Sequence, residues 1–196
     1  MKAFCVESLL IACCAVAGSG LSYGQALPHA MPAGQQAAAV EKNPPGDIPD
    51  NQVFVLYRSP LGFSIKVPEG WARHETTGSV TFTDKYNTVG ITVSSRAQPP
   101  TLDDLRAREV NQLKQTGSAV SVPTVKAVRL PSGSALVVSY ASNSERNAVT
   151  NKAIRLDNDR YFFWKDGKLA TLTLSAPSGA DNADQWQLMA RSFGWR

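Results

Sequence analysis

Cysteine and histidine are scarce in this chain of 196 residues, and their positions leave little room for chemistry. The three cysteines, Cys5, Cys13 and Cys14, all lie close to the N-terminus. If that segment is removed, the rest of the chain has no thiol, which excludes disulfides, thiolate metal sites and cysteine nucleophiles. Of the two histidines, only His74 lies in the part that we expect to fold. Stability is therefore expected to come from packing, since 43% of the residues are hydrophobic.

Long apolar runs are also absent, apart from one at the N-terminus that is too short to cross a bilayer. Residues 8–21 are uncharged and mostly apolar, and a single lysine precedes them. This pattern is typical of a secretory signal peptide. The small residues Gly24 and Ala26 fit the −3 and −1 positions of a cleavage site. We therefore expect residues 1–26 to be a signal peptide and the mature chain to begin at Leu27, without a transmembrane helix.

A lipid anchor is the alternative to simple secretion. The segment Leu10–Cys13 resembles a bacterial lipobox, which ends in the cysteine that is lipidated. Glu7 interrupts the short apolar run, which favours cleavage after Ala26 instead. In both cases the sequence predicts an exported protein, periplasmic or extracellular. It would be tethered to a membrane if Cys13 were lipidated.

A strong excess of one charge is missing as well. The chain carries a net charge of +4, and residues 51–196 hold 18 Lys and Arg against 12 Asp and Glu, a net +6. A mild excess of this kind favours an acidic protein, or an envelope complex with an acidic surface, as the partner. Nucleic-acid binding is not expected, because it needs clustered Lys and Arg.

The rest of the sequence divides into a spacer and one domain. Residues 27–50 are rich in Ala, Pro, Gly and Gln and are expected to form a flexible spacer, which places the domain at residues 51–196. Alternation of apolar and polar residues within the domain is typical of strands. The expected strands cover residues 53–57, 63–67, 79–83, 88–94, 122–130, 135–140, 151–156, 161–165 and 169–176.

Short turns between the last three strands make the predicted sheet largely antiparallel. Asp157-Asn158-Asp159 and Asp166-Gly167 are expected to close hairpins, and Asp-Gly is a strong signal for a type I′ turn. The strand at residues 161–165 carries aromatics on both faces, which is typical of a central strand covered on both sides. The predicted fold class is therefore α+β, a largely antiparallel β-sheet sandwiched between helices.

Two helices are expected. Thr101 precedes two aspartates and an apolar stripe, which is the pattern of a capped helix start, and Gly117 ends that helix. The second begins near Asp181 and places Trp186, Met189, Ala190 and Phe193 on one side. Of the four tryptophans, we expect Trp71, Trp164 and Trp186 to be buried and Trp195 to be exposed.

No catalytic, cofactor-binding or metal-binding residue is expected, and therefore no cofactor. A Ser-His-Asp arrangement would need His74 as its base, but no Gly-x-Ser-x-Gly elbow occurs, and His74 is expected to be a solvated loop residue. One histidine without thiols does not make a zinc site. Asp157 begins like a calcium loop, but Phe162 and Lys168 occupy the sixth and twelfth positions, where that loop needs Gly and Glu.

Three stretches of the domain belong together as a pattern. They are the opening hairpin at residues 57–71, which reads YRSPLGFSIKVPEGW, the helix start Pro100-Thr101-Leu102, and the closing segment LTLSAP at residues 172–177 with Ser192-Phe193. Together they resemble the PsbP/Mog1/DcrB-like superfamily, and the resemblance spans residues 52–196. The opening motif specifies a hairpin and a tryptophan, so it concerns structure and not chemistry.

The resemblance implies a non-catalytic accessory or assembly factor with an antiparallel sheet between helices. Some members are extrinsic photosystem II subunits linked to calcium retention, and others are envelope lipoproteins or a regulator of a small GTPase, so fold alone does not fix function. No metal-binding residue of the family can be carried over. The N-terminus lacks the Arg- and Ser-rich character of a chloroplast transit peptide, which favours a bacterial envelope protein. A hydrolase with an unrecognised site and a calcium-linked extrinsic photosystem II-type subunit remain alternatives.

Overall fold

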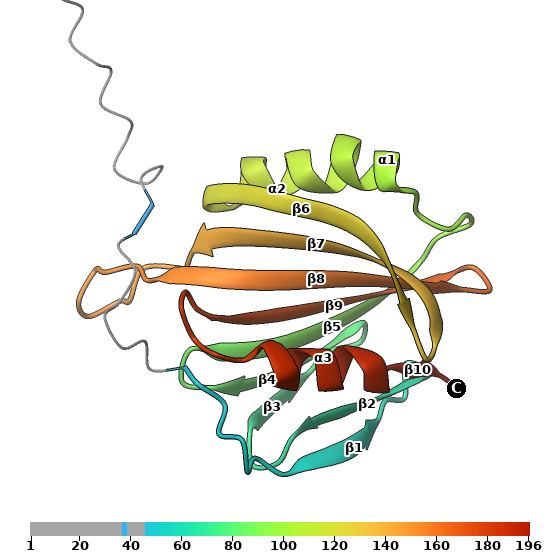
Figure 1. The fold of residues 1–196 in the computed structure, drawn as a ribbon, viewed down its shortest axis with the longest axis horizontal. Coiled ribbons are helices and arrows are strands. Elements are labelled where there is room, and N and C mark those ends of the chain that lie inside the picture. Colours follow the sequence, from blue (N-terminus) through green and yellow to red (C-terminus); the bar gives the residue numbers. More distant parts are fainter. Residues whose placement is uncertain (1–36, 39–45) are drawn as a thin grey trace, which may run out of the picture. The chain divides into compact units, whose positions relative to one another are not determined.

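The computed structural model describes residues 37–38 and 46–196, so the predicted signal peptide and most of the predicted spacer lie outside the described residues. The strands form two sheets (Figure 1). In chain order they are β1 (Phe54–Arg58), β2 (Phe63–Pro68), β3 (Ala72–Glu75), β4 (Ser79–Asp84), β5 (Asn87–Ser95), β6 (Ser118–Leu130), β7 (Gly133–Asn143), β8 (Arg155–Lys165), β9 (Lys168–Pro177) and β10 (Gly194–Trp195).

The helices fall between β5 and β6 and near the C-terminus. The first helical segment consists of α1 (Leu102–Asp104), the π-helical turn η1 (Leu105–Glu109) and α2 (Val110–Thr116), and the second is α3 (Ala183–Ser192). In the described part of the chain, no helix is both long and apolar enough to span a bilayer.

Both sheets are antiparallel throughout, which confirms the predicted largely antiparallel sheet. One has seven strands in the order β3-β4-β5-β9-β8-β7-β6, and the other has three in the order β1-β2-β10. Pairing of β5 with β9 joins the N-terminal hairpins to the C-terminal ones, with Ile91 opposite Leu172 at its centre. The strands β6 to β9 follow one another as consecutive hairpins.

One face of the large sheet is covered by the small sheet together with α3. Phe63 of β2, Leu172 of β9 and Met189 of α3 are fully buried in one apolar cluster. The ring of Phe193 stacks between those of Phe63 and Phe163, with centroids 5.6 and 4.1 Å away. Because each large apolar side chain contributes about 1.5–3 kcal/mol on burial, this cluster holds the two sheets together.

The opposite face of the large sheet is covered by the first helical segment. Leu105 and Leu113 pack against Val138, Tyr140 and Phe162 in a second, smaller cluster. Helices therefore pack on the sheet as expected. Helices alone do not make the sandwich, since on one face the three-stranded sheet shares the cover with α3.

The predicted start and end of the first helical segment are confirmed. The Thr101 hydroxyl accepts the Asp104 N–H (3.1 Å), and the Asp104 carboxylate accepts the Thr101 N–H (3.1 Å). The backbone N–H of Thr101 and then its hydroxyl hold the pKa of Asp104 below its usual value. Gly117 ends the segment in an extended conformation, and glycine suits this position because a Cβ there would lie 2.5 Å from a methyl group of Val120 and 2.7 Å from the Leu113 carbonyl oxygen.

The hairpin turn predicted at Asp157-Asn158-Asp159 is wrong. These residues lie inside β8, and the connection from β7 occupies residues 144–154, where a strand was partly expected. The Asn158 amide is buried and donates to the Tyr140 carbonyl oxygen (3.3 Å) and to Ser142 Oγ (3.1 Å). Bonds to a neighbouring strand thus satisfy a side chain that otherwise favours turns.

The turn predicted at Asp166-Gly167 is confirmed. Both residues have positive φ, 48° and 80°, as the two central residues of a type I′ turn require. Two other details differ from prediction. Strand β3 was not expected, and all four tryptophans are half-buried instead of three being buried and Trp195 exposed.

Residues 46–50 lie within the predicted spacer, yet they contact the domain. Ile48 is only 3% exposed and belongs to the main apolar cluster. Its N–H donates to Asn182 Oδ1 (2.6 Å), and the Asn182 amide donates to the Gly46 carbonyl oxygen (2.8 Å). These contacts fix the chain against the start of α3.

Candidate functional site

Strand β8 sends its alternate side chains to opposite faces of the sheet, as every strand does. Asp157, Asp159 and Tyr161 lie on the face that α3 partly covers. Asn158 and Arg160 lie on the other. In the segment Asp157-Asn158-Asp159, which was predicted to be a turn, the two carboxylates therefore lie on one face of the sheet and the amide lies on the other.

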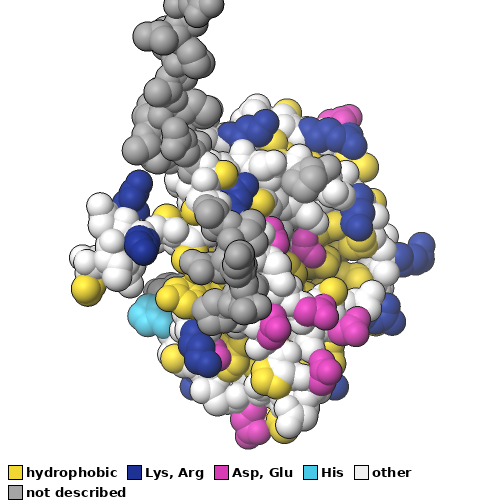
Figure 2. Space-filling model, turned by 60° about the vertical axis from the view of Figure 1, so that its left-hand side comes forward, with side chains coloured by type: hydrophobic (Ala, Val, Ile, Leu, Met, Phe, Trp, Pro, Cys, Tyr) yellow, Lys and Arg dark blue, Asp and Glu magenta, His cyan; other side chains and the backbone are white. Residues whose placement is uncertain are grey.

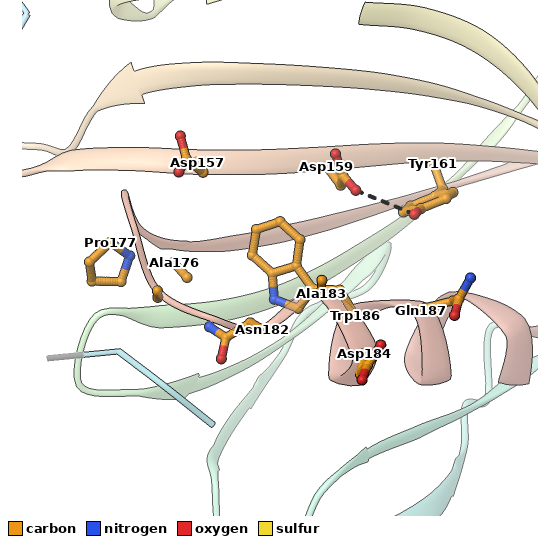
Figure 3. A pocket seen from close by; sticks show the side chains of 11 residues that line it. Asp157, Asp159, Tyr161, Ala176, Pro177, Asn182, Ala183, Asp184, Trp186 and Gln187 are labelled. Atoms are coloured by element: carbon orange, nitrogen blue, oxygen red, sulfur yellow. Dashed lines mark hydrogen bonds between the residues drawn. The ribbon is translucent and has the colours of Figure 1, made fainter. Parts of the chain in front are cut away.

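These two carboxylates line a pocket between β8, the end of β9 and the start of α3 (Figure 3), which we call the acidic pocket. It has a volume of 490 Å³, and the described residues that line it include three carboxylates, two aromatic rings and no Lys, Arg or His. Its lining residues are Asp157, Asp159, Tyr161, Ala176, Pro177, Ala180, Asn182, Ala183, Asp184, Trp186 and Gln187.

Each strand carboxylate is held by two hydrogen bonds. Asp159 accepts from Ser139 Oγ (2.6 Å) and from the Tyr161 hydroxyl (3.4 Å). Asp157 accepts from Ser178 Oγ (2.9 Å) and from the Gly179 N–H (3.3 Å) through a single oxygen. A carboxylate has about four acceptor positions, so both groups keep capacity for a further donor. In the described residues neither forms an ion pair.

Tyr161 is fixed beside Asp159. Burial raises the pKa of its hydroxyl far above the ordinary value of 10.0, and the Asp159 charge and the hydrogen bond between the two raise it further. The hydroxyl is therefore a neutral donor at all physiological pH values. Its ring also stacks on Phe163 (6.2 Å), which ties the pocket wall to the main core.

Trp186 and Asp184 complete the pocket from α3. The indole of Trp186 projects from the helix toward β8, and Asp159 lies across from it (Figure 3). Asp184 sits in the first turn of α3, where a negative charge is favoured by the helix dipole. Asn182 forms the buried base of this turn through its bonds to Gly46 and Ile48.

The arrangement suits a positively charged organic group. Carboxylates and an indole ring both attract an ammonium or guanidinium ion, the indole through its electron-rich face. A guanidinium can in addition donate two parallel hydrogen bonds to one carboxylate. Figure 2 shows that Asp and Glu side chains gather toward the middle of one face of this basic domain, with Lys and Arg largely around the rim.

The other face of β8 carries a polar cluster whose members already have partners. Arg160 forms an ion pair with Glu109 of η1 and donates to Thr173 Oγ1 (3.1 Å) and to the Tyr140 hydroxyl (3.2 Å). Its guanidinium also lies 5.5 Å from the centre of the Tyr140 ring. The cluster therefore fastens the first helical segment to the sheet.

Comparison with known proteins identifies the fold. No family model matches the chain, and no curated protein matches it by sequence. The solution structure of cyanobacterial PsbP (CyanoP) from Synechocystis sp. PCC 6803 is similar, with a TM-score of 0.52 and 18% identity over 77% of this chain and 98% of that one. The Ran-binding protein Mog1p of Saccharomyces cerevisiae gives a TM-score of 0.51 and 8% identity over 74% and 96%. The chain has the PsbP/Mog1-like fold.

The histidine that the sequence analysis considered as a catalytic base lies apart from the acidic pocket. His74 lies on the exposed strand β3 and not in a loop; its backbone pairs with Thr81 of β4, and its side chain forms no hydrogen bond to the described residues. Asp103 and Asp104 serve the start of the first helical segment, as expected. In the described residues, no group of three or more His, Cys, Asp or Glu side chains is arranged to hold a metal ion.

The residues of the acidic pocket were missed by sequence reasoning. Asp157 and Asp159 were taken as a turn, and Trp186 was taken only as part of a buried helix face. A signal was nevertheless present, because Asp157, Asp159 and Tyr161 alternate with Asn158 and Arg160 at the period of a strand. That α3 lies opposite these residues could not be inferred from local pattern.

Proposed function

We propose that this protein is a non-catalytic accessory protein of the bacterial cell envelope that binds a partner protein, and that the acidic pocket receives a Lys or Arg side chain of that partner. The acidic pocket carries the proposal, because the described residues that line it combine three carboxylates with two aromatic rings and include no cation. The PsbP/Mog1-like fold is consistent with this role, since Mog1p is a Ran-binding protein.

The overall charge supports a partner that is acidic elsewhere on its surface. Residues 51–196 have a net charge of +6, which favours association with an acidic protein or envelope complex. Such a partner needs only one exposed cation to occupy the acidic pocket. The negative charge of the pocket and the positive charge of the remaining surface therefore act at different places. The pocket selects one cationic side chain of the partner, and the remaining surface favours association with an acidic partner.

Binding of a small peptide tests the pocket directly. We expect acetyl-Gly-Arg-Gly-amide to bind more tightly than the same peptide with citrulline in place of arginine. Citrulline has nearly the same shape as arginine but no charge. Asp159→Asn should weaken binding of the arginine peptide at least about tenfold, because a hydrogen bond to a charged group is worth about 1.5–3 kcal/mol. Calorimetric titration of the two peptides measures both effects.

The matched control is Asp166→Asn, which removes the same charge at the β8–β9 turn. Asn tolerates the positive φ of 48° found at this position, so the fold should be kept. This variant should bind the arginine peptide as the parent does. Equal binding of the arginine and citrulline peptides by the parent would refute the proposed role of the acidic pocket.

Export is the second part of the proposal, and it rests on the uncharged run at residues 8–21. We expect the protein isolated from its native host to begin at Leu27. A mass that corresponds to a lipidated Cys13 would instead indicate a lipoprotein. Retention of Met1 would contradict export by either route, and intact-mass measurement distinguishes the three outcomes.

A further inference from the structure

Exposed apolar side chains concentrate at β1. Three of the large hydrophobic residues that are exposed in the described part of the chain lie on or beside this strand: Val53 (57% exposed), Val55 (40%) and Leu56 (45%). Val53 and Val55 lie on one face of the strand and Leu56 lies on the other, so both faces of this edge carry exposed apolar side chains. A hollow of 390 Å³ with Trp71 and Phe82 in its wall continues the apolar surface beside the strand.

Strand β1 also presents free backbone groups. It pairs with β2, and no strand formed by the described residues lies on its other side. The bond from the Ser59 N–H to the Phe63 carbonyl oxygen (2.9 Å) shows that the odd-numbered residues form the hydrogen-bonded pairs with β2. Because such pairs alternate along antiparallel strands, Phe54, Leu56 and Arg58 direct their N–H and C=O groups toward the open side.

The long edges of the seven-stranded sheet are protected against pairing in a way that β1 is not. Strand β3 exposes Arg73 and Glu75, and β6 exposes Lys126 and Arg129. Charged side chains on an edge strand discourage the addition of a further strand. The only charged residue of strand β1 is Arg58, at its last position. It is therefore the described edge best suited to accept another strand.

We propose that β1 pairs with β1 of a second copy of this chain, in an antiparallel register centred on Leu56. Leu56 then faces the partner's Leu56. Phe54 faces the partner's Arg58, and Val55 faces the partner's Tyr57. Even-numbered residues face even-numbered ones, so the open N–H and C=O groups of both strands meet.

The sequence of β1 is complementary to itself in this register. No like charges face each other, and Arg58 meets an aromatic ring at each end of the ladder, which is a favourable contact. A two-fold interface of this kind uses the same surface on both copies. The proposal depends on β1 alone and not on the acidic pocket.

Substitutions at Leu56 test the register, because this position faces itself. Leu56→Lys or Leu56→Glu places like charges opposite each other, whereas an equal mixture of the two variants places opposite charges together. In sedimentation equilibrium of the full chain, we expect the parent to dimerise as concentration rises. Each variant alone should dimerise at least about tenfold more weakly, and the mixture should recover. Leu188→Lys and Leu188→Glu, at an exposed position of α3, are the controls and should behave as the parent does.

Three outcomes would overturn the proposal: a parent that stays monomeric at the highest soluble concentration, Leu56 variants that dimerise as the parent does, and a mixture without recovery. Hydrogen exchange in the unmodified chain gives a second measurement that needs no variant. The Leu56 amide should exchange more slowly as concentration rises, since it would donate across the interface. A rate that is the same at all concentrations contradicts the pairing.

Discussion

Asp159 and Tyr161 act together in the acidic pocket although they differ in charge. The Tyr161 hydroxyl donates to Asp159, so the carboxylate is held toward the pocket while the phenol stays protonated. Ser139 fixes the other oxygen of the same carboxylate. A side chain held in this way loses little freedom when it binds a cation, which preserves affinity.

The raised pKa of Tyr161 predicts how stability depends on alkaline pH. A group whose pKa is raised by folding contributes stability below its ordinary value of 10.0 and loses that contribution as pH rises through the folded-state pKa. Tyr161→Phe removes this contribution. The melting temperature of the variant should therefore fall less between about pH 9 and pH 11 than that of the parent. Some loss should remain, because burial also raises the pKa of Tyr140.

The control for this prediction is Tyr86→Phe, which removes an exposed phenol outside the acidic pocket. Its alkaline melting curve should follow that of the parent. If Tyr161→Phe and the parent lose stability in parallel over the same pH range, burial and the contact with Asp159 do not raise the pKa of Tyr161 as described. Spectrophotometric titration of the phenols provides an independent check.

At the scale of elements, the start of the first helical segment depends on Thr101. Its hydroxyl accepts the Asp104 N–H, which otherwise has no partner within the helix. Thr101→Ala should cost about 0.5–2 kcal/mol of unfolding free energy. For a domain of this size, about 2–4 °C is lost per kcal/mol, so the melting temperature should fall by roughly 1–8 °C. Thr101→Ser keeps the hydroxyl and should melt close to the parent, whereas equal melting of the Ser and Ala variants would show that the cap contributes nothing.

Elements with a regular local pattern could be predicted from the sequence. The alternation of Phe63, Ile65 and Val67 predicted a strand. The cap at Thr101 and the glycine at Gly117 predicted the two ends of a helix. Asp166-Gly167 fixed a turn because both residues tolerate positive φ. In these cases the chain's local preference and its tertiary contacts agree.

Elements that depend on distant partners could not be predicted. Strand β3 consists of four exposed residues and lacks any apolar alternation. Its extended conformation therefore depends mainly on its pairing with β4. Asn158 stays in a strand because Tyr140 and Ser142 accept its amide protons. The acidic pocket joins β8 to α3, which are separated in sequence, so it appears only once the sheet and helix are placed together.

At the scale of the whole molecule, the acidic pocket and the net charge of the domain have opposite signs. Residues 51–196 carry +6, yet carboxylates are the only charged groups among the described residues that line the pocket. Net charge acts at long range and mainly sets the association rate, whereas a close hydrogen-bonded pair mainly sets the dissociation rate. The two contributions can therefore be separated by kinetics.

An acidic peptide with one central arginine makes that separation measurable. In stopped-flow experiments its association rate should fall as salt is raised toward 1 M, where the screening length drops to about 3 Å from about 8 Å at physiological ionic strength. Asp159→Asn makes the domain more positive, so association with the acidic peptide should be unchanged or faster. Dissociation from that variant should be about tenfold faster, because the guanidinium loses a charged partner.

The same peptide with citrulline in place of arginine again separates the effect on association from the effect on dissociation. It should associate with the same salt dependence, since its flanking acidic residues are unchanged, but it should dissociate from the parent about as fast as the arginine peptide does from Asp159→Asn. Asp166→Asn should leave the dissociation of both peptides unchanged. An association rate that does not fall with salt would show that the +6 charge does not steer acidic partners. The acidic pocket would then have to select its partner by itself, through contacts that form only after the two molecules meet.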